Sequence, residues 1–307
     1  MEQTAVEKKF GKYVMASMIT MFLQSAYSMI DGLFVSNLIG DTALSAVNVA
    51  WPIIAVVTAI GTGVGCGGAV MMSTKQGEGK NEESNIVRAN VILALLASSI
   101  VVTILFLILL TPLLKLMGAE GELLRLSQIY GRVMLTGGVL QILSCGLTPL
   151  LRNDNRAVSA MMIMVGGLFV NLGLDFVFMY VFHMGIGGAA GASLCAQLFT
   201  TLCCLIILGT KKTDPIRFSQ FIIRKEYWKK IFKTAVSPFG ISLTPSLLIL
   251  YHNVACLKFG GDLAVKAYAL ISSTVGSYRV LLIGVAEGIQ HLQVMPMAHM
   301  IFMRSGK

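Results

Sequence analysis

Apolar stretches of roughly 20 or more residues recur along the whole chain, and only short polar segments separate them. Each stretch is long enough to cross the hydrocarbon core of a bilayer as a helix. Continuous apolar runs favour helices over membrane β-strands, which alternate apolar and polar residues. The pattern therefore predicts an all-α polytopic membrane protein of about eight transmembrane helices, at residues 13–36, 43–74, 89–114, 123–151, 157–183, 188–210, 231–257 and 263–290.

The composition agrees with a chain that lies in lipid. Of its 307 residues, 55% are hydrophobic and 13% are charged, and the mean hydropathy is +0.77. A water-soluble domain needs a more polar surface than this composition supplies. The six cysteines lie within or beside apolar runs, without the paired Cys-x-x-Cys spacing of a zinc site. We expect them to be small packing residues, and we expect no cofactor.

The net charge of +9 is unevenly distributed along the chain. Cations gather in the two ends of the chain and in alternate polar segments, above all in the long connection 211–230. Loops rich in Lys and Arg stay on the cytoplasmic side of a membrane, so we expect a bacterial-type inner-membrane protein with both termini in the cytoplasm and no nucleic-acid partner. Outside 211–230, these cations include Lys8, Lys9, Lys12, Lys75, Lys80, Arg88, Arg152 and Arg156.

A short segment recurs in the second part of the chain. Residues 38–47 align with residues 259–268, with identities at Gly40, Asp41, Ala43 and Ala46. Internal duplication is common in secondary transporters; a Gly-Asp-x-Ala turn that merely opens a helix is the alternative explanation. The repeat predicts four parts: a six-helix lobe at 1–210, a basic cytoplasmic linker at 211–230, the first two helices of an incomplete second lobe at 231–290, and an aberrant tail at 291–307.

The predicted tail differs in character from the spans before it. After Gln290 the chain reads HLQVMPMAHM and ends in RSGK, which is typical neither of a helix nor of a terminus. Since Met has a single codon, this stretch can be tested against a shifted reading frame, and the shifted frame is compatible with a small, aromatic and Gly-Ala continuation. We therefore hypothesise a frameshift close to Gln290 and a C-terminally truncated product.

Several short motifs resemble the multidrug and toxic compound extrusion (MATE) family. They are MIDGLFV at 29–35 with LIG at 38–40, GGAAGAS at 187–193 and GVAEGIQ at 284–290, and the similarity extends over residues 10–290. The resemblance implies a secondary-active antiporter that exports drugs or other cationic or amphipathic compounds in exchange for Na⁺ or H⁺. Members of the family have twelve helices in two lobes, so this chain lacks four of them, which leaves open that it is an inactive fragment.

A few polar side chains lie inside the predicted spans. Asp31, Asp175 and Ser193 come out at similar depths when a rise of about 1.5 Å per residue is applied from the nearest outward turns, and Tyr130 could join them. Asn171 lies one helical turn before Asp175 and shares its face. Ionisable groups in membrane spans commonly mark ion pathways. Carboxylate, amide and hydroxyl oxygens suit Na⁺, and two neighbouring carboxylates can instead share a proton. The resemblance likewise places these five residues at the coupling site, with Tyr130 outside the Na⁺ ligand set.

Other readings of the polar residues stay open. Asn171 and Asp175 could form an interhelical hydrogen-bonding pair without binding an ion. Glu287 and Arg279, in the span 263–290, suggest either a buried ion pair or a contact with substrate. The glycine-rich run 61–68 has no phosphate-loop context, and we predict that it is a close-packing helix face.

Two rival functions compete with the antiporter. A lipid-linked glycan flippase would need several cations in its cavity, and the spans offer essentially Arg279 alone. A membrane-embedded transferase enzyme would need clustered acids or a nucleophile beside a base, which the sequence does not supply. The preferred partners are therefore the lipid bilayer and small drug-like molecules, with no obligate protein partner and no enzymatic activity.

Overall fold

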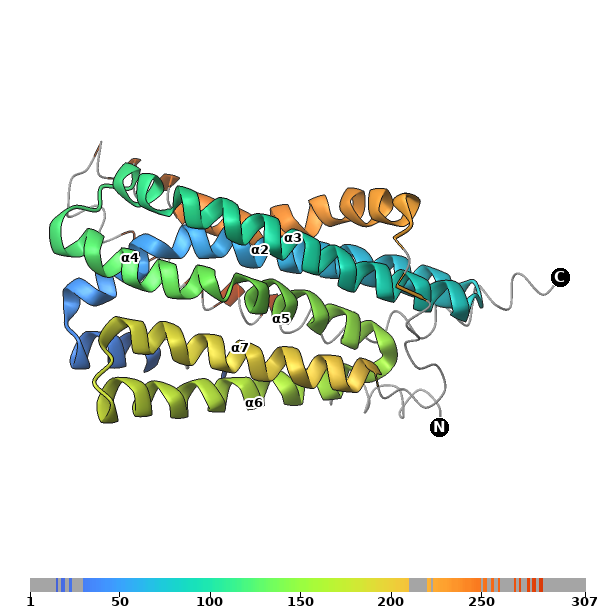
Figure 1. Ribbon diagram of the computed structural model, residues 1–307, viewed down its shortest axis with the longest axis horizontal. Coiled ribbons are helices and arrows are strands. Elements are labelled where there is room, and N and C mark those ends of the chain that lie inside the picture. The colour runs from blue at the N-terminus through green and yellow to red at the C-terminus, as the bar shows by residue number, and fades with distance from the viewer. Residues whose placement is uncertain are drawn as a thin grey trace. The chain divides into compact units, whose positions relative to one another are not determined.

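The computed structural model describes residues 30–209, 220–221, 223–249 and scattered positions on either side of them. The predicted tail at 291–307 and half of the linker at 211–230 lie outside the described residues. The chain divides into two compact units, of which the larger runs from Tyr27 to Ser242. The helices labelled in Figure 1 all belong to this larger unit.

Most of the described residues are helical, and none of them lies in a strand. After a helix at 30–38 come four long helices and a broken pair. The helix at 225–249 follows the linker. The labelled elements are α2 (Asp41–Gly77), α3 (Asn81–Leu116), α4 (Gly121–Thr136), α5 (Gly138–Leu151), α6 (Ala157–Asp175) and α7 (Gly185–Gly209), with π-helical turns η1 (Arg152–Arg156) and η2 (Phe176–Val181) at either end of α6.

These helices confirm the predicted all-α membrane fold. Within the described part of the chain, four helical segments are long and apolar enough to cross a bilayer, and α4 with α5 supplies a fifth if the bent pair is one span. The described helices extend beyond several predicted spans because charged first and last turns continue a helix into the headgroup region. For example, α3 begins at Asn81, eight residues before its predicted start at 89.

The extra turns at the start of α3 change the position of one predicted loop cation. Arg88 lies inside α3, and its side chain is 1% exposed. The expectation that Arg88 belongs to a cytoplasmic loop is therefore wrong. Its guanidinium instead forms an ion pair with Asp154 of η1, at 3.8 Å between Nη1 and Oδ2.

The turn before α2 depends on a glycine. Gly40 has φ of 118°, a left-handed conformation that side chains with a Cβ rarely adopt. The amide N–H groups of Ile39 and Gly40 both donate to the Val35 carbonyl, which closes the helix at 30–38. The Ser36 hydroxyl then donates to the Asp41 carboxylate at 2.6 Å, so that the acid stands in the first turn of α2, where it complements the helix dipole.

The glycine-rich run of α2 is a close-packing surface, as predicted. A Cβ on Gly61 would stand 2.7 Å from the Ile142 carbonyl oxygen, and one on Gly65 would collide with the backbone of Gly146. On the other side of α2, a Cβ on Gly63 would stand 2.9 Å from the Phe239 Cβ. Small residues four apart let membrane helices approach closely. The run therefore fixes α2 against α5 and against the helix at 225–249.

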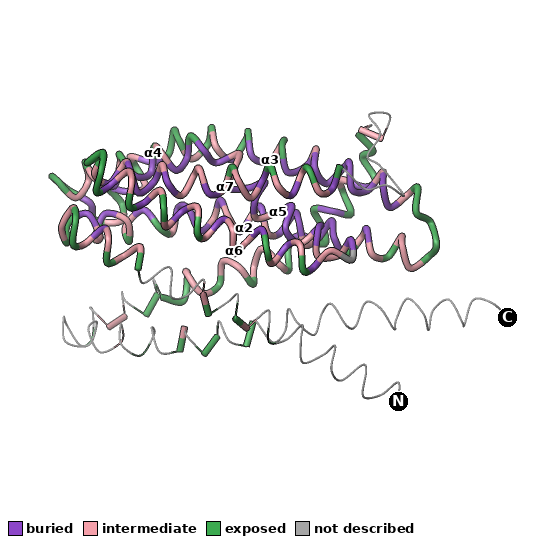
Figure 2. Tube along the Cα trace, turned by 90° about the horizontal axis from the view of Figure 1, so that it is seen from below, coloured by how far each residue is buried: buried purple, intermediate pink, exposed green. Residues whose placement is uncertain are grey.

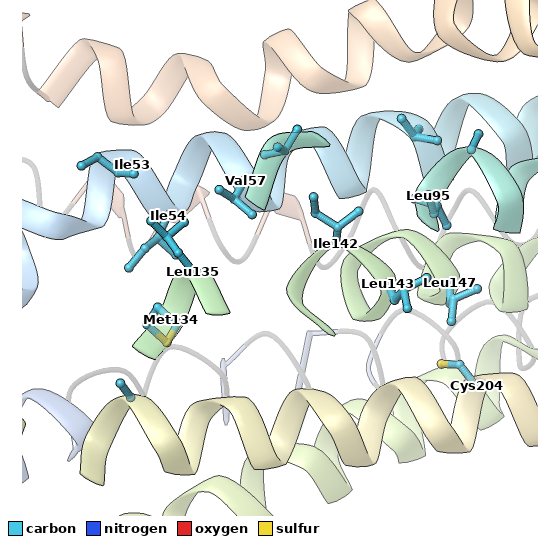
Figure 3. Packing of buried hydrophobic residues seen from close by; sticks show 14 of the residues in the cluster. Ile53, Ile54, Val57, Leu95, Met134, Leu135, Ile142, Leu143, Leu147 and Cys204 are labelled. Carbon is cyan, nitrogen blue, oxygen red and sulfur yellow. The ribbon is translucent and has the colours of Figure 1, made fainter. Parts of the chain in front are cut away.

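Buried apolar side chains from several helices meet around α2 and α5 (Figure 3). Along the helices of the larger unit, buried and exposed positions alternate (Figure 2). In the middle of α3 the exposed positions are themselves large and apolar, at Ile100, Val101, Ile104, Leu105 and Ile108. A helix with apolar side chains on its outer face suits lipid rather than water. The buried residues labelled in Figure 3 are Ile53, Ile54, Val57, Leu95, Met134, Leu135, Ile142, Leu143, Leu147 and Cys204.

The predicted span 123–151 is broken. Its first part, α4, and its second part, α5, meet at Gly137 with a bend of 57°. The side chain of Leu194 from α7 occupies the place of a Cβ on Gly137, and the side chain of Thr103 from α3 occupies the place of one on Gly138. Paired glycines and side chains inserted beside them are common causes of sharp helix kinks. A continuous apolar pattern gives no sign of such a break.

Candidate functional site

Two of the predicted site residues meet between separate helices. The carboxyl of Asp31, in the helix at 30–38, lies within hydrogen-bonding contact of the carboxyl of Asp175, at the end of α6. Asp175 is completely buried. Two carboxylates in a low-dielectric site cannot both stay charged at such short range unless a cation or a proton lies between them. The pair therefore has the chemistry of an ion-binding or proton-binding site.

Asn171 supports Asp175 from within α6. Its side-chain amide donates from Nδ2 to Asp175 Oδ2 at 3.0 Å, and both side chains are buried. The two residues are one turn apart, which places them on one face of the helix. This hydrogen bond lies inside a single helix, so it orients Asp175, while the contact with Asp31 joins α6 to the helix at 30–38.

Tyr130 belongs to the same group of side chains. It lies in α4, is 6% exposed, and is close enough to Asp31 and Asp175 for the charge of either carboxylate to act on its phenol. A phenol hydroxyl can donate to a carboxylate or accept from a protonated one. Three of the helices predicted to contribute therefore bring their polar residues together.

Ser193 is placed differently. It lies in α7 and is half-buried, and the described structure gives its hydroxyl no hydrogen bond to either carboxylate. Its neighbour Leu194 packs against Gly137 at the break between α4 and α5. Ser193 is thus the sequence neighbour of a residue that packs at the break between α4 and α5. Its role as a cation ligand remains a prediction.

The second predicted pair, Arg279 and Glu287, falls outside the larger unit. Arg279 is exposed, and Glu287 lies outside the described residues. The prediction that they form an ion pair or a substrate contact therefore stays a prediction.

The donor set fits a hard monovalent cation better than a transition metal. The described residues contain no group of three or more His, Cys, Asp or Glu side chains able to hold a metal. What the site offers is carboxylate oxygen: one oxygen of Asp31, Oδ1, is buried without a hydrogen-bond partner among the described residues. A buried acceptor without a donor is costly. A bound Na⁺ or a proton on this carboxyl would remove that cost.

Sequence reasoning missed a second buried polar cluster. Arg88 of α3 pairs with Asp154 of η1, and both side chains are 1% exposed. Gln76, at the end of α2, donates from Nε2 to Asp154 Oδ1 at 3.5 Å. The available signal was the segment 152–156, Arg-Asn-Asp-Asn-Arg, in which a lone acid stands in a basic loop.

A bundle of apolar helices with a buried pair of carboxylates is typical of ion-coupled membrane transporters. The family model MatE matches residues 16–177, more than half of the chain, and the chain belongs to this family. The resemblance seen in the sequence motifs is thereby confirmed.

Curated relatives carry the name multidrug export protein MepA. The protein from Staphylococcus saprophyticus is 24% identical over 290 residues, and the protein from Staphylococcus aureus strain NCTC 8325 is 23% identical over 290 residues. In each case the match covers 94% of this chain and 64% of the relative. The chain thus spans about 64% of the length of the curated relatives that it matches.

Solved structures share the fold. A MATE protein in the bent conformation superposes with a TM-score of 0.84 at 26% identity, over 96% of this chain and 65% of that protein. A MOP superfamily transporter from Pyrococcus furiosus, described as having a binding pocket of reverse polarity, gives a TM-score of 0.85 at 25% identity, over 96% of this chain and 68% of that protein.

Proposed function

We propose that the chain acts as a secondary-active antiporter that exports drugs or other cationic or amphipathic compounds in exchange for Na⁺ or H⁺. The observation that carries this proposal is the contact between the carboxyls of Asp31 and Asp175 on two separate helices. The MatE family membership and the export function named for the MepA relatives support it. Those relatives are named for export rather than for an enzymatic reaction, which agrees with the expectation of transport without catalysis.

Binding of the coupling ion would act on helix packing. Without an ion, the negative charges of Asp31 and Asp175 repel each other and push the helix at 30–38 away from α6. A cation between them, or a proton on one of them, turns the repulsion into an attraction. Asn171 holds the Asp175 carboxylate in place through its 3.0 Å hydrogen bond, so the change acts on the position of the helices rather than on a side-chain rotamer.

Export follows if the two ion states favour different arrangements of these helices. A ligand shifts a conformational equilibrium only by its difference in affinity for the two states. The ion favours the arrangement in which the carboxyls are together, and a cationic compound competes for the same negative charge. Ion entry then promotes drug release, and drug binding promotes ion release.

The wider organisation belongs to the same proposal. We place a six-helix lobe at 1–210, the basic linker at 211–230 and the start of a second lobe at 231–290. Both termini lie in the cytoplasm, and the protein lies in an inner membrane of bacterial type, with the bilayer and drug-like compounds as its partners. The charge distribution supports this orientation.

The test is ion binding by the purified chain in detergent. We expect radioactive Na⁺ to bind to the wild type, and Asp31→Asn and Asp175→Asn to weaken binding by about tenfold or more, because each removes a charged ligand worth about 1.5–3 kcal/mol. Glu122→Gln is the matched control, since Glu122 is an exposed acid of α4 engaged with Arg125.

A proton-coupled protein gives a different result. In that case Na⁺ does not bind, and adding a cationic dye such as ethidium releases protons from the wild type but not from the Asp175→Asn variant. If neither Na⁺ binding nor dye-dependent proton release depends on the two carboxylates, the proposed antiport is wrong.

A further inference from the structure

The break between α4 and α5 contains a fully buried amide side chain. Gln141 is 0% exposed, and its Nε2 donates to the Met134 carbonyl oxygen at 2.7 Å. Met134 lies before the break and Gln141 after it, so this bond bridges the two helices. In a straight helix a backbone N–H would donate to such a carbonyl. The Gln141 amide therefore takes over the role of a backbone donor at the bend.

The backbone around the break is rearranged in keeping with this role. The Gly137 carbonyl accepts from both Leu140 N, at 2.8 Å, and Gln141 N, at 3.1 Å. A tighter turn of this kind leaves carbonyls of the preceding turn without their usual partner. An unsatisfied carbonyl costs free energy in lipid, where water does not replace the donor. The Gln141 side chain removes this cost at one of them.

Burying the amide of Gln141 costs free energy that an apolar packing residue would avoid. Its second polar atom, Oε1, is buried without a hydrogen-bond partner among the described residues. An apolar side chain of similar volume, such as Leu or Met, would fill the same space without burying an amide. The donor to Met134 is thus the feature that sets glutamine apart from an apolar residue here.

Each side of the break is held by its own contacts. The second helix, α5, packs on α2, because Gly61 and Gly65 bring its backbone into direct contact with that of α2, whereas α4 is joined to α2 by a hydrogen bond from the Ser127 hydroxyl to the Ala46 carbonyl at 3.3 Å. The first helix of the broken pair, α4, carries Tyr130, whose phenol lies within reach of the charges of Asp31 and Asp175. The bend angle therefore decides where Tyr130 stands relative to Asp31 and Asp175.

We propose that Gln141 is a positioning residue for the coupling site: its amide holds the bend between α4 and α5 and thereby sets the position of Tyr130 relative to the carboxyl pair. Gln141 itself does not touch the ion. The inference rests on the proposed function for its consequence in ion binding, while the bend itself can be measured independently of any ion.

The bend is tested in the Gln141→Leu variant by double electron–electron resonance, which measures the distance between two spin labels. The labels are attached to cysteines introduced at Arg125 of α4 and Val158 of α6, which are exposed sites, in a background whose six native cysteines are replaced. Arg125 is about 18 Å along the helix from Gly137, so each 10° of straightening moves its label by about 3 Å. We expect such a shift in Gln141→Leu. An unchanged distance distribution overturns the proposal.

The matched control is Ser144→Ala. Ser144 is also buried in α5, and its hydroxyl donates to the Gln141 carbonyl at 3.0 Å, within one helix. Its removal costs a side-chain hydrogen bond in the same span without touching the break. We expect the label distance of the wild type in this variant. If Ser144→Ala shifts the label as much as Gln141→Leu does, the bend depends on general packing and the proposal fails.

Ion affinity tests the consequence. Gln141→Leu should weaken binding of the coupling ion by about tenfold, equivalent to about 1.4 kcal/mol, because Tyr130 shifts relative to the two carboxyls. Combined with Tyr130→Phe, it should add little, because Gln141 acts through Tyr130. The positioning role is refuted if the losses of ion affinity in Gln141→Leu and Tyr130→Phe are fully additive. It is also refuted if Gln141→Leu shifts the label distance but leaves ion affinity unchanged. A wild type whose ion binding is independent of Asp31 and Asp175 refutes the antiport and the positioning role, leaving the label result to decide the bend alone.

Discussion

The buried ion pair between Arg88 and Asp154 yields a sharp prediction about stability. The guanidinium Nη1 and the carboxylate Oδ2 are 3.8 Å apart, and both side chains are 1% exposed. The pair joins α3 to the turn η1 between α5 and α6. Removing either charge by Arg88→Met or Asp154→Leu leaves the other charge buried without its counter-ion.

The expected cost follows from this burial. Breaking a buried ion pair on one side typically destabilises a protein by about 3–5 kcal/mol. That range corresponds to roughly two to four powers of ten in the unfolding equilibrium. The double variant, in which Met and Leu face each other, should lose far less, since apolar residues of similar volume replace a buried pair at little cost or even with a gain. The two single losses are thus strongly non-additive.

Reversible unfolding of the purified protein in mixed micelles measures these differences. The control is Arg125→Met, which breaks an exposed pair with Glu122 whose side chains are 65% and 55% exposed. Exposed pairs contribute about 0–1 kcal/mol, so this variant should stay close to the wild type. If Arg88→Met and Asp154→Leu unfold like Arg125→Met, or if the double variant is as unstable as the sum of its singles, the reasoning from burial is refuted.

Three further predictions concern the packing and charge of the larger unit. Gly65→Ala should destabilise the protein by at least about 1–3 kcal/mol in the same unfolding assay, because its Cβ collides with the α5 backbone. Hydrogen bonds from Lys75 and Lys80 lower the pKa of Glu78 in the turn after α2. The ionised Glu78 carboxylate therefore stabilises the folded protein above the pKa that Glu78 has in the unfolded chain, and this contribution is lost as pH falls through the lower pKa of the folded state. Lys75→Met should therefore raise the Glu78 pKa towards its ordinary value, as ¹³C NMR of labelled Glu would show. Asn171→Leu should lower the free energy of unfolding by about 1.5–3 kcal/mol and weaken ion binding, because the Asp175 carboxylate loses a buried hydrogen-bond donor. Unchanged Na⁺ or proton binding would contradict this.

The sequence alone was sufficient for the class of fold, and it singled out Asp31, Asn171 and Asp175, which the structure brings close together. In lipid, a long apolar run can hydrogen-bond all of its own backbone N–H and C=O groups only as a helix, which is why the spans were predictable. Asp31, Asn171 and Asp175 stood out because ionisable and amide groups are rare in such runs, and estimates of depth along a helix need only its fixed rise per residue. The glycine run of α2 was predictable for a similar reason, since small residues serve close helix contact.

The tertiary structure decided which polar groups meet and where helices break. Arg88 looked like a loop cation because local sequence does not reveal that Asp154, far along the chain, neutralises it inside the protein. Gln141 carried no signal at all, because the need for its amide arises only from the bend at Gly137, where side chains from two other helices, Leu194 and Thr103, lie against the paired glycines. Hydropathy is a property of single residues and their neighbours in sequence. Ion pairing and helix bending are set by contacts between distant segments, and they appear only once those segments are packed together.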